Sequence, residues 1–393
     1  MHARILSSCL SALVLAGILG FDSAIAKLPA ELKQQIAAIQ AVGPEGAGNP
    51  AAAIAFKELS ASRTDAILPL LRAIESSGPL ARNWLRSAVE VIVERELRSQ
   101  KTLPVDGLRV FLLDTRQAPE ARRLAYDLLA KIDPASAKKL IPGFLNDPST
   151  ELRRDAVAQL VTKGKSLTED DKAAAIATYR KALDAARDVD QVKVIATELS
   201  ETLGQEVDLP RHFGFLVHWQ VIGPFDNSGR DGFAAVFPPE KKVDLDAAHA
   251  GKGEEQVKWQ PLVSTNEYGK IDLNKPLGKL KEVTGYAYSE FVAEQAGPAE
   301  LRLGCKNAWK IWLNGELMFG RDEYHRGQRI DQYKMSVHLK EGKNVILVKL
   351  CQNEMKEKWT VEWEFQLRVC DATGTAILST GRPATPRAEA ATK

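Results

Sequence analysis

The sequence predicts a protein with two folded parts, an α-helical domain followed by an antiparallel β-sandwich. Residues 27–205 are rich in Ala, Leu, Arg and Glu, and their apolar residues recur at the three-to-four spacing of amphipathic helices. From Phe215 onward, short runs of Val, Ile, Trp, Tyr and Phe alternate with Gly, Asn and Pro, as in strands joined by turns. The change falls in "VDLPRHFG", where Pro210 and Gly214 interrupt the helical spacing.

The first 26 residues have the pattern of a secretory signal peptide. "MHAR" is basic, residues 5–21 are mostly apolar, and "AIAK" supplies small residues before a cleavage after Ala26. A transmembrane anchor is the alternative, but the apolar run is short and interrupted by serines. We therefore expect an exported protein, periplasmic or extracellular, without membrane insertion after cleavage.

Charge and cysteine content exclude several classes of protein. The formal net charge is only +2, and Lys and Arg are dispersed, so nothing indicates a nucleic-acid partner. After cleavage the chain keeps Cys305, Cys351 and Cys370, which are too few for a disulfide framework. One bridge, such as Cys305 with Cys351, remains open at this stage.

The helical region contains a weak repeat. "WLRSAVEVI", "ARRLAYDLL" and "LRRDAVAQL" place Arg86, Arg123 and Arg154 two residues before an alanine, at intervals of about 35 residues. Another helix-like segment precedes each of them. "LIPGFLNDPSTELRRDAVAQL" resembles a HEAT repeat, and this resemblance implies helix pairs stacked into a short solenoid that presents a surface. A plain helical bundle is the alternative.

The stretch "AWKIWLNGELMFG", residues 308–320, predicts a β-hairpin, because Asn314-Gly315 is the preferred two-residue type I′ turn. A two-residue loop determines which residues of the two strands lie opposite each other. The predicted pairs are Leu313 with Glu316, Trp312 with Leu317, Ile311 with Met318 and Lys310 with Phe319.

This hairpin is apolar on both faces, whereas a half-buried hairpin is usually apolar on one. Trp312, Leu317 and Phe319 share the second face. We expect protein to cover it, either the helical domain or the long loop 226–258. A ligand platform is the alternative, since large exposed apolar patches are unusual on soluble proteins.

The last strand and the domain limits complete the prediction. "WTVEWEFQL" alternates, which places Trp359, Val361, Trp363 and Phe365 inward and Glu362, Glu364 and Gln366 outward. Residues 381–393, "GRPATPRAEAATK", have the composition of a disordered tail. The predicted parts are a signal peptide (1–26), a HEAT-like helical domain (27–205), a β-sandwich (206–380) and the tail (381–393).

The segments "AELRLGCKNAWKIWLNGELMFG" and "LKEGKNVILVKL" resemble the galactose-binding-like jelly roll, known from the sugar-binding domains of family 2 glycoside hydrolases. The resemblance implies an antiparallel jelly-roll sandwich and carbohydrate binding. Those enzymes take their catalytic carboxylates from a separate barrel of about 250 residues. Only fifteen residues follow Leu378, so we expect the binding architecture without the catalytic domain.

The loop "GRDEYHRGQR", which follows the hairpin, is the strongest candidate for ligand binding. Proteins hold sugars with an aromatic face and polar side chains around it. The candidate residues are Arg321, Tyr324, His325, Arg326 and Arg329. The alternative is a solvated charged loop.

A second loop, "FDNSGRDGF", brings Asp226, Asn227 and Asp231 together. Hard oxygen ligands on a tight loop suit a structural Ca²⁺, which is the only cofactor the sequence suggests. The alternative is that these Asp and Asn side chains simply form the turn.

No G-x-S-x-G or H-E-x-x-H pattern occurs, and no other catalytic motif stands out. We therefore predict an exported, non-catalytic binding or scaffold protein, whose partner is a glycan or another protein. The alternative is a carbohydrate-active hydrolase or its accessory subunit, with Glu362 and Glu364 as an acid pair.

Overall fold

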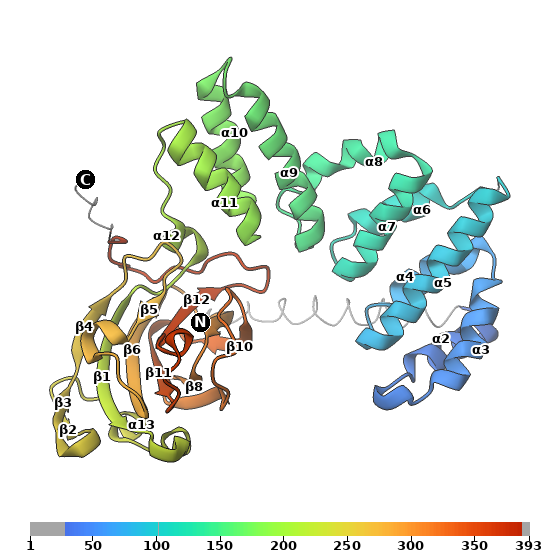
Figure 1. The fold of residues 1–393 in the computed structure, drawn as a ribbon. Helices are drawn as coiled ribbons and strands as arrows, with labels where there is room; N and C mark the ends of the chain where they lie inside the picture. The colour runs from blue at the N-terminus through green and yellow to red at the C-terminus, as the bar shows by residue number, and fades with distance from the viewer. Residues whose placement is uncertain (1–27, 101, 387–393) are drawn as a thin grey trace, which may run out of the picture. The chain divides into compact units, whose positions relative to one another are not determined.

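The computed structural model describes residues 28–100 and 102–386. Contacts divide the chain into two compact units, and the division falls between Ser166 and Leu167 (Figure 1). The predicted signal peptide and the end of the predicted tail lie outside the described residues. Within the described residues, no helix is both long and apolar enough to cross a membrane.

The first unit is α-helical, as predicted (Figure 1). Apolar residues from successive helices form one continuous core, while the opposite faces carry charged side chains. The HEAT-like stacking of these helices into a solenoid stays a prediction. The helices are α2 (Ala30–Gln40), α3 (Asn49–Ser60), α4 (Ile67–Ala73), α5 (Pro79–Arg98), α6 (Val105–Leu113), α7 (Pro119–Ile132), α8 (Pro134–Leu140) and α9 (Thr150–Leu167).

Adjacent arginines of α7 have different roles. Arg123, from the repeated motif, lies 3.0 Å from Asp127 one turn later and 2.5 Å from Asp155 on α9. Arg122 is almost fully buried and donates two hydrogen bonds to Asp147, at 2.7 and 2.6 Å. Bidentate pairing provides the hydrogen bonds that a buried guanidinium requires. The two arginines thus tie α7 to the chain that follows it.

The second unit begins with helices and continues into antiparallel sheets, in the predicted order (Figure 1). Its longer helices are α10 (Lys172–Ala185), α11 (Val189–Thr197) and α12 (Leu209–Phe213). The six-stranded sheet contains, in spatial order, β4 (Gln260–Val263), β1 (His218–Asp226), β6 (Val283–Ala293), β11 (Gly342–Gln352), β8 (Ala308–Leu313) and β9 (Glu316–Arg321). The four-stranded sheet contains β10 (Tyr333–Leu339), β7 (Gly297–Cys305), β12 (Glu364–Cys370) and β5 (Ile271–Asp272).

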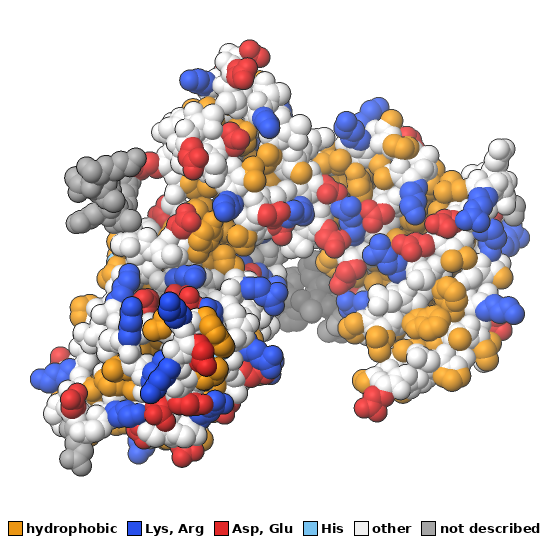
Figure 2. Space-filling model, viewed as in Figure 1, with side chains coloured by type: hydrophobic (Ala, Val, Ile, Leu, Met, Phe, Trp, Pro, Cys, Tyr) orange, Lys and Arg blue, Asp and Glu red, His pale blue; other side chains and the backbone are white. Residues whose placement is uncertain are grey.

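The two sheets form a β-sandwich, because apolar side chains from both enter one buried core. A small ribbon of β2 (Ala248–Ala250) and β3 (Gln256–Lys258) lies in the long segment between β1 and β4. On the face drawn in Figure 2, acidic and basic side chains are interspersed over each unit.

The predicted hairpin is present as β8 and β9, and its first two pairs have the predicted register. A bulge then shifts the pairing, so that Phe319 rather than Met318 lies opposite Ile311. β9 is an edge strand, where bulges are common because no further strand constrains the chain. The predicted pairs of Ile311 with Met318 and Lys310 with Phe319 are therefore wrong, and Phe319 contacts Trp309 instead.

The second face of the hairpin is covered by protein at Trp312, as predicted. Trp312 is 7% exposed and belongs to a buried cluster on the outer face of the six-stranded sheet. The long segment 227–258, called the covering segment below, supplies Phe237, Val243 and Val257 to this cluster. The prediction fails for Leu317 and Phe319, which remain 50% and 45% exposed on the edge strand. The bulge pairs Phe319 with Ile311, whose side chain lies in the core between the two sheets rather than in this cluster.

A buried ammonium group holds this segment in place. Lys349, on β11, is fully buried, and its Nζ donates to the carbonyls of Phe233 (3.2 Å) and Ala235 (2.6 Å). The same nitrogen lies 2.8 Å from Glu240, whose carboxylate also accepts the hydroxyl of Tyr286. Burial lowers the pKa of Lys349 and its carboxylate partner acts against that shift. All three protons of the ammonium group have acceptors on or near the covering segment.

The final strand differs from the prediction at its start. β12 begins at Glu364, and Trp359 lies in a short 3₁₀ turn where it is 56% exposed rather than buried. Trp363 and Phe365 are fully buried, as predicted. Gln366 was predicted to face outward to solvent but is 2% exposed.

The three cysteines are buried and free, so the bridge considered between Cys305 and Cys351 is not formed. Burial raises the pKa of the Cys305 thiol to about 12 and that of Cys351 to about 11. Thiols with such pKa values are poor nucleophiles at neutral pH.

We predict that Lys349→Met lowers the free energy of unfolding by about 3–5 kcal/mol, because Glu240 and two carbonyls would lose their partner. Urea denaturation measures this change. Lys343→Met is the matched control, since Lys343 lies on the same strand but is half exposed in its ion pair with Glu290. A loss no larger than that of the control would contradict the anchoring role.

We also predict that Trp312→Ala costs about 3–5 kcal/mol of stability, because it leaves a cavity beneath the covering segment. Phe319→Ala, an aromatic truncation at a half-exposed position of the same hairpin, should cost much less. Thermal melting compares the two variants. A Trp312→Ala curve that overlays the parent curve would show that this side chain does not contribute to packing.

Candidate functional site

Three loops meet at one end of the sandwich. β1, β11 and β9 run parallel to one another, because each is separated from the next by one antiparallel strand. The loops that follow them, 227–233, 353–363 and 322–332, therefore lie at the same edge. They enclose an open pocket of about 500 Å³, the loop pocket. Its lining residues are Arg230, Asp322, Glu323, Tyr324, His325, Arg326, Asn353, Met355 and Trp359.

Aromatic rings form one wall of the loop pocket. The ring of His325 lies edge-on to Trp359 with centroids 5.2 Å apart, and Tyr324 is 6.2 Å from His325. The guanidinium of Arg230 lies 5.3 Å from the centre of the Tyr324 ring. Trp359 keeps 56% of its surface exposed, so an apolar face remains available to a ligand.

Asn227 ties this wall to the sheet. It is fully buried, and its Nδ2 donates to the Tyr324 hydroxyl (3.1 Å) and to the carbonyl of Gln352 (2.9 Å). Burial raises the pKa of Tyr324, so its phenol stays protonated at neutral pH. The predicted metal-binding and ligand-binding loops are therefore adjacent in space, although about 95 residues separate them.

Asn353 supplies a polar group with unused hydrogen-bonding capacity. It is fully buried, and its Oδ1 lies 2.9 Å from Nε2 of His325. Its Nδ2 has no hydrogen-bond partner among the residues that the structure describes. Unpartnered buried donors are rare in folded proteins, and this one belongs to a residue that lines a pocket.

The backbone at His325 is strained. Its φ is +59°, in the left-handed region, and its backbone N–H donates to the carbonyl of Lys306 at 2.6 Å. Left-handed conformations of residues other than glycine concentrate at functional sites. The conformation directs the His325 ring between Tyr324 and Trp359.

The charged residues of the loop pocket are of both signs. Arg230 forms a half-exposed ion pair with Glu354 at 2.5 Å, and its hydrogen bonds lower the pKa of that carboxyl to about 2. Arg326 lies 3.4 Å from Glu323. Exposed ion pairs are weak, so these groups can exchange partners for the hydroxyls of a ligand.

The structure brings together part of the predicted ligand set. Tyr324, His325 and Arg326 line the loop pocket. Arg321 does not line it, and its guanidinium lies over Phe319 at 5.8 Å. Arg329 does not line it either.

Sequence reasoning missed Arg230, Asn353 and Trp359. The available signal for Trp359 was its position in "MKEKWT", where a lone aromatic follows a charged run. Nothing in the sequence around Arg230 or Asn353 indicates a binding site. Their loops lie next to the predicted loop only because of the order of the strands in the sheet.

The predicted calcium residues make contacts typical of a turn. Asp226 accepts hydrogen bonds from the backbone and hydroxyl of Ser228, at 3.2 and 2.7 Å, and lies 3.1 Å from Nζ of Lys252. The hydrogen bonds from Ser228 lower the pKa of Asp226. Within residues 28–386, no group of three or more His, Cys, Asp or Glu is arranged to hold a metal. A site that includes Asp231 stays a prediction, and the contacts favour the turn.

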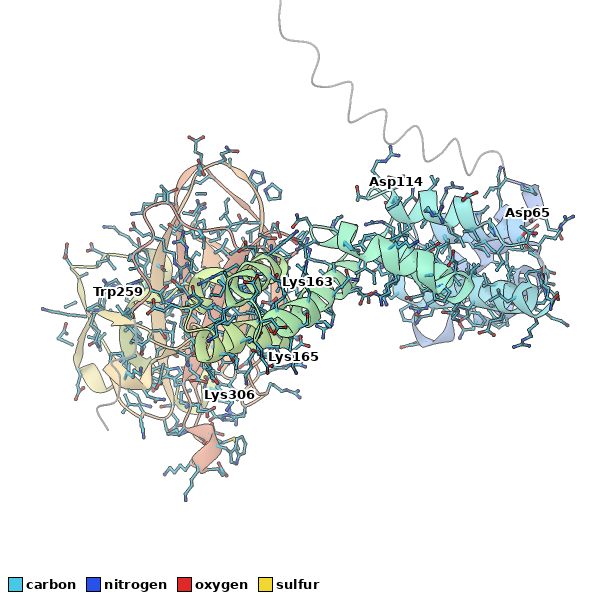
Figure 3. The ribbon with its side chains drawn as sticks, turned by 90° about the horizontal axis from the view of Figure 1, so that it is seen from above. Asp65, Asp114, Lys163, Lys165, Trp259 and Lys306 are labelled. Atoms are coloured by element: carbon cyan, nitrogen blue, oxygen red, sulfur yellow. The ribbon has the colours of Figure 1, made fainter. Side chains whose placement is uncertain are left out.

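Glu362 and Glu364 each have a lysine partner. Glu364 lies 2.9 Å from Lys270, and Glu362 forms an ion pair with Lys306, which Figure 3 labels. Both carboxylates are therefore engaged in ion pairs within the protein. This arrangement favours a strand-end role over an acid pair for hydrolysis.

Comparison with known proteins gives distant structural similarity only. No family model matches the chain, and no curated protein matches it. A family 35 carbohydrate binding module from Clostridium thermocellum is similar to 23% of this chain, over 72% of its own length, with 16% identity and a TM-score of 0.18. A beta-glucosidase from Kluyveromyces marxianus is similar to 76% of this chain over 38% of its own length, with 12% identity and a TM-score of 0.25.

A third solved structure, the GH31 alpha-xylosidase from Xanthomonas citri, is similar to 40% of this chain, with 10% identity and a TM-score of 0.19. The match spans 16% of that enzyme's length.

For the loop at Asp226 we predict that the melting temperature is the same in about 1 mM Ca²⁺ and in EDTA, because Ser228 and Lys252 already engage this carboxylate. A ligand that binds only the folded state would raise the melting temperature. A calcium-dependent rise that disappears in Asp226→Ala would instead establish the metal site.

Proposed function

We propose that this protein is an exported, non-catalytic binding protein that holds a glycan in the loop pocket. The observation that carries the proposal is the half-exposed Trp359 in the same pocket as the buried, unpartnered Nδ2 of Asn353. A sugar has an apolar C–H face and a polar rim. The first can stack on Trp359 while a ring hydroxyl accepts from Asn353 Nδ2.

The surrounding residues suit the same ligand. Arg230 and Arg326 reach the pocket and have weakly held, exposed ion pairs that a hydroxyl-rich ligand can replace. His325 is held by Asn353, and Tyr324 by Asn227, so this wall is preorganised. The signal-peptide pattern of residues 1–26 supports export, and the resemblance to galactose-binding-like domains supports a carbohydrate ligand.

For the helical unit we propose a HEAT-like stack that presents a surface to a protein partner. Its support is the succession of ion pairs between matched helices: Arg82 of α5 lies 2.9 Å from Glu120 of α7, and Arg123 of α7 lies 2.5 Å from Asp155 of α9. Such links between successive repeats are expected in a stacked array.

The test of the glycan site is Trp359→Ala. We predict that a glycan array identifies ligands of the mature protein and that calorimetry then shows at least about tenfold weaker binding by the variant. Its melting temperature should match the parent, because the side chain is half exposed. Phe319→Ala is the control, since Phe319 is an aromatic residue of comparable exposure outside the pocket, and this variant should bind normally.

Two results would overturn the proposal. The first is the absence of any glycan ligand, and the second is binding that Trp359→Ala and Asn353→Ala leave unchanged. Turnover of a polysaccharide that Glu362→Gln abolishes would move the protein to the alternative class, the carbohydrate-active hydrolases.

A further inference from the structure

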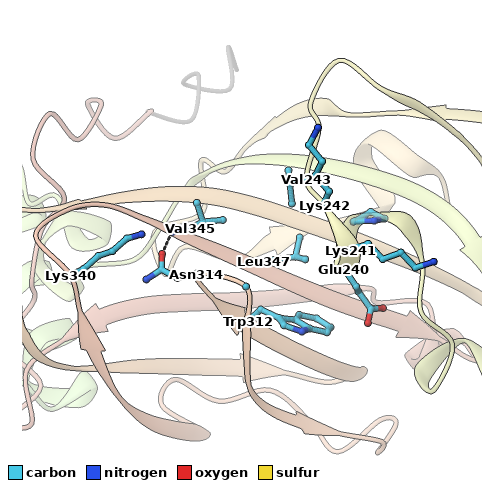
Figure 4. A pocket seen from close by; sticks show the side chains of 11 residues that line it. Glu240, Lys241, Lys242, Val243, Trp312, Asn314, Lys340, Val345 and Leu347 are labelled. Atoms are coloured by element: carbon cyan, nitrogen blue, oxygen red, sulfur yellow. Dashed lines mark hydrogen bonds between the residues drawn. The ribbon is translucent and has the colours of Figure 1, made fainter.

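A second pocket lies on the outer face of the six-stranded sheet, where the covering segment meets the hairpin (Figure 4). This hairpin pocket has a volume of about 270 Å³. It is separate from the loop pocket, with which it shares no lining residue. Its lining residues are Pro239, Glu240, Lys241, Lys242, Val243, Trp312, Asn314, Gly315, Lys340, Val345 and Leu347.

The floor of the hairpin pocket is apolar. Trp312 and Leu347 are nearly buried, at 7% and 5% exposure, and Val345 and Val243 pack against the same cluster. Because so little of the indole is accessible, the floor offers a small apolar surface rather than an open stacking platform. A ligand that fills this space would present an apolar body to it.

The walls are preformed, because hydrogen bonds hold their polar residues. Asn314 accepts from the backbone N–H of Val345 at 2.9 Å (Figure 4). It also donates to Asn344 at 3.0 Å, and the two bonds order the hairpin turn. On the opposite wall, Glu240 is held by Lys349. Binding here would require little reorganisation of the protein.

The charge left around this cavity is positive. The only carboxylate that lines it, Glu240, is neutralised by the buried Lys349. Lys241 and Lys340 form no ion pair with any residue in the described part of the chain, and Lys242 is a weak, exposed partner of Asp244 at 3.4 Å. In Figure 4, Lys340 lies on one side of the cavity and Lys241 and Lys242 on the other.

We propose that the hairpin pocket binds a small amphipathic carboxylate. The apolar body of such a ligand would lie on Trp312, Val345 and Leu347. Its carboxylate would face Lys340, a mobile single-charge donor that suits a carboxylate at the rim of a cavity. Lys241 and Lys242 add attraction from the other side. This site is independent of the glycan site.

The probe for the test is 2-naphthoate, compared with uncharged 2-naphthamide of nearly the same shape, by calorimetry on the mature protein. We expect the acid to bind at least about tenfold more tightly than the amide, because only the acid is attracted by the lysines. Added salt should weaken binding of the acid and leave the amide unaffected. Equal affinity for the two compounds, or no binding of either, would overturn the proposal.

Two variants test whether the ligand binds in the hairpin pocket. Lys340→Gln should weaken binding of 2-naphthoate about threefold or more, while Lys334→Gln, an exposed lysine on the four-stranded sheet, should not change it. Val345→Phe should fill the cavity and remove binding, with a melting curve that confirms folding. Binding that persists in Val345→Phe would show that the ligand lies elsewhere. Glycan binding should be unchanged in Val345→Phe, which separates this proposal from the preceding one.

Discussion

The ammonium group of Lys349 is the constraint on which the outer face of the larger sheet depends. A fully buried cation is stable only when acceptors surround it, and here they come from Phe233, Ala235 and Glu240. All three belong to the segment that covers the sheet. The buried charge thus fixes the path of a long, irregular connection that has only short helical turns and a two-stranded ribbon of its own.

Both candidate pockets include residues of this one segment. At its beginning, Asn227 and Arg230 contribute to the loop pocket, and in its middle Glu240 and Val243 form a wall of the hairpin pocket. The other residues that line the loop pocket differ from those that line the hairpin pocket. A rigid sheet with an anchored cover therefore supports two sites of different chemistry, one aromatic with mixed charge and one apolar with a positive rim.

Much of the fold was predictable because local patterns are strong in this chain. Helical spacing identified the first region, and alternation with Gly and Asn turns identified most strands. The Asn314-Gly315 turn correctly set the first two pairs of the hairpin. The site was only partly predictable. The loop of Tyr324 and His325 stood out by its composition, whereas Asn353 and Trp359 lie in a loop that is brought to this site by the order of the strands in the sheet.

The sequence by itself determined the order of helices and strands, the turn of the hairpin and the loop that holds half of the loop pocket, because these depend on residues close together in the chain. Only the tertiary structure decided that a bulge shifts the pairing of Phe319, which segment covers Trp312 and that Trp359 is exposed. These outcomes depend on which distant segment packs against each face. The anchor that selects that segment, Lys349, is separated from its acceptors by more than a hundred residues.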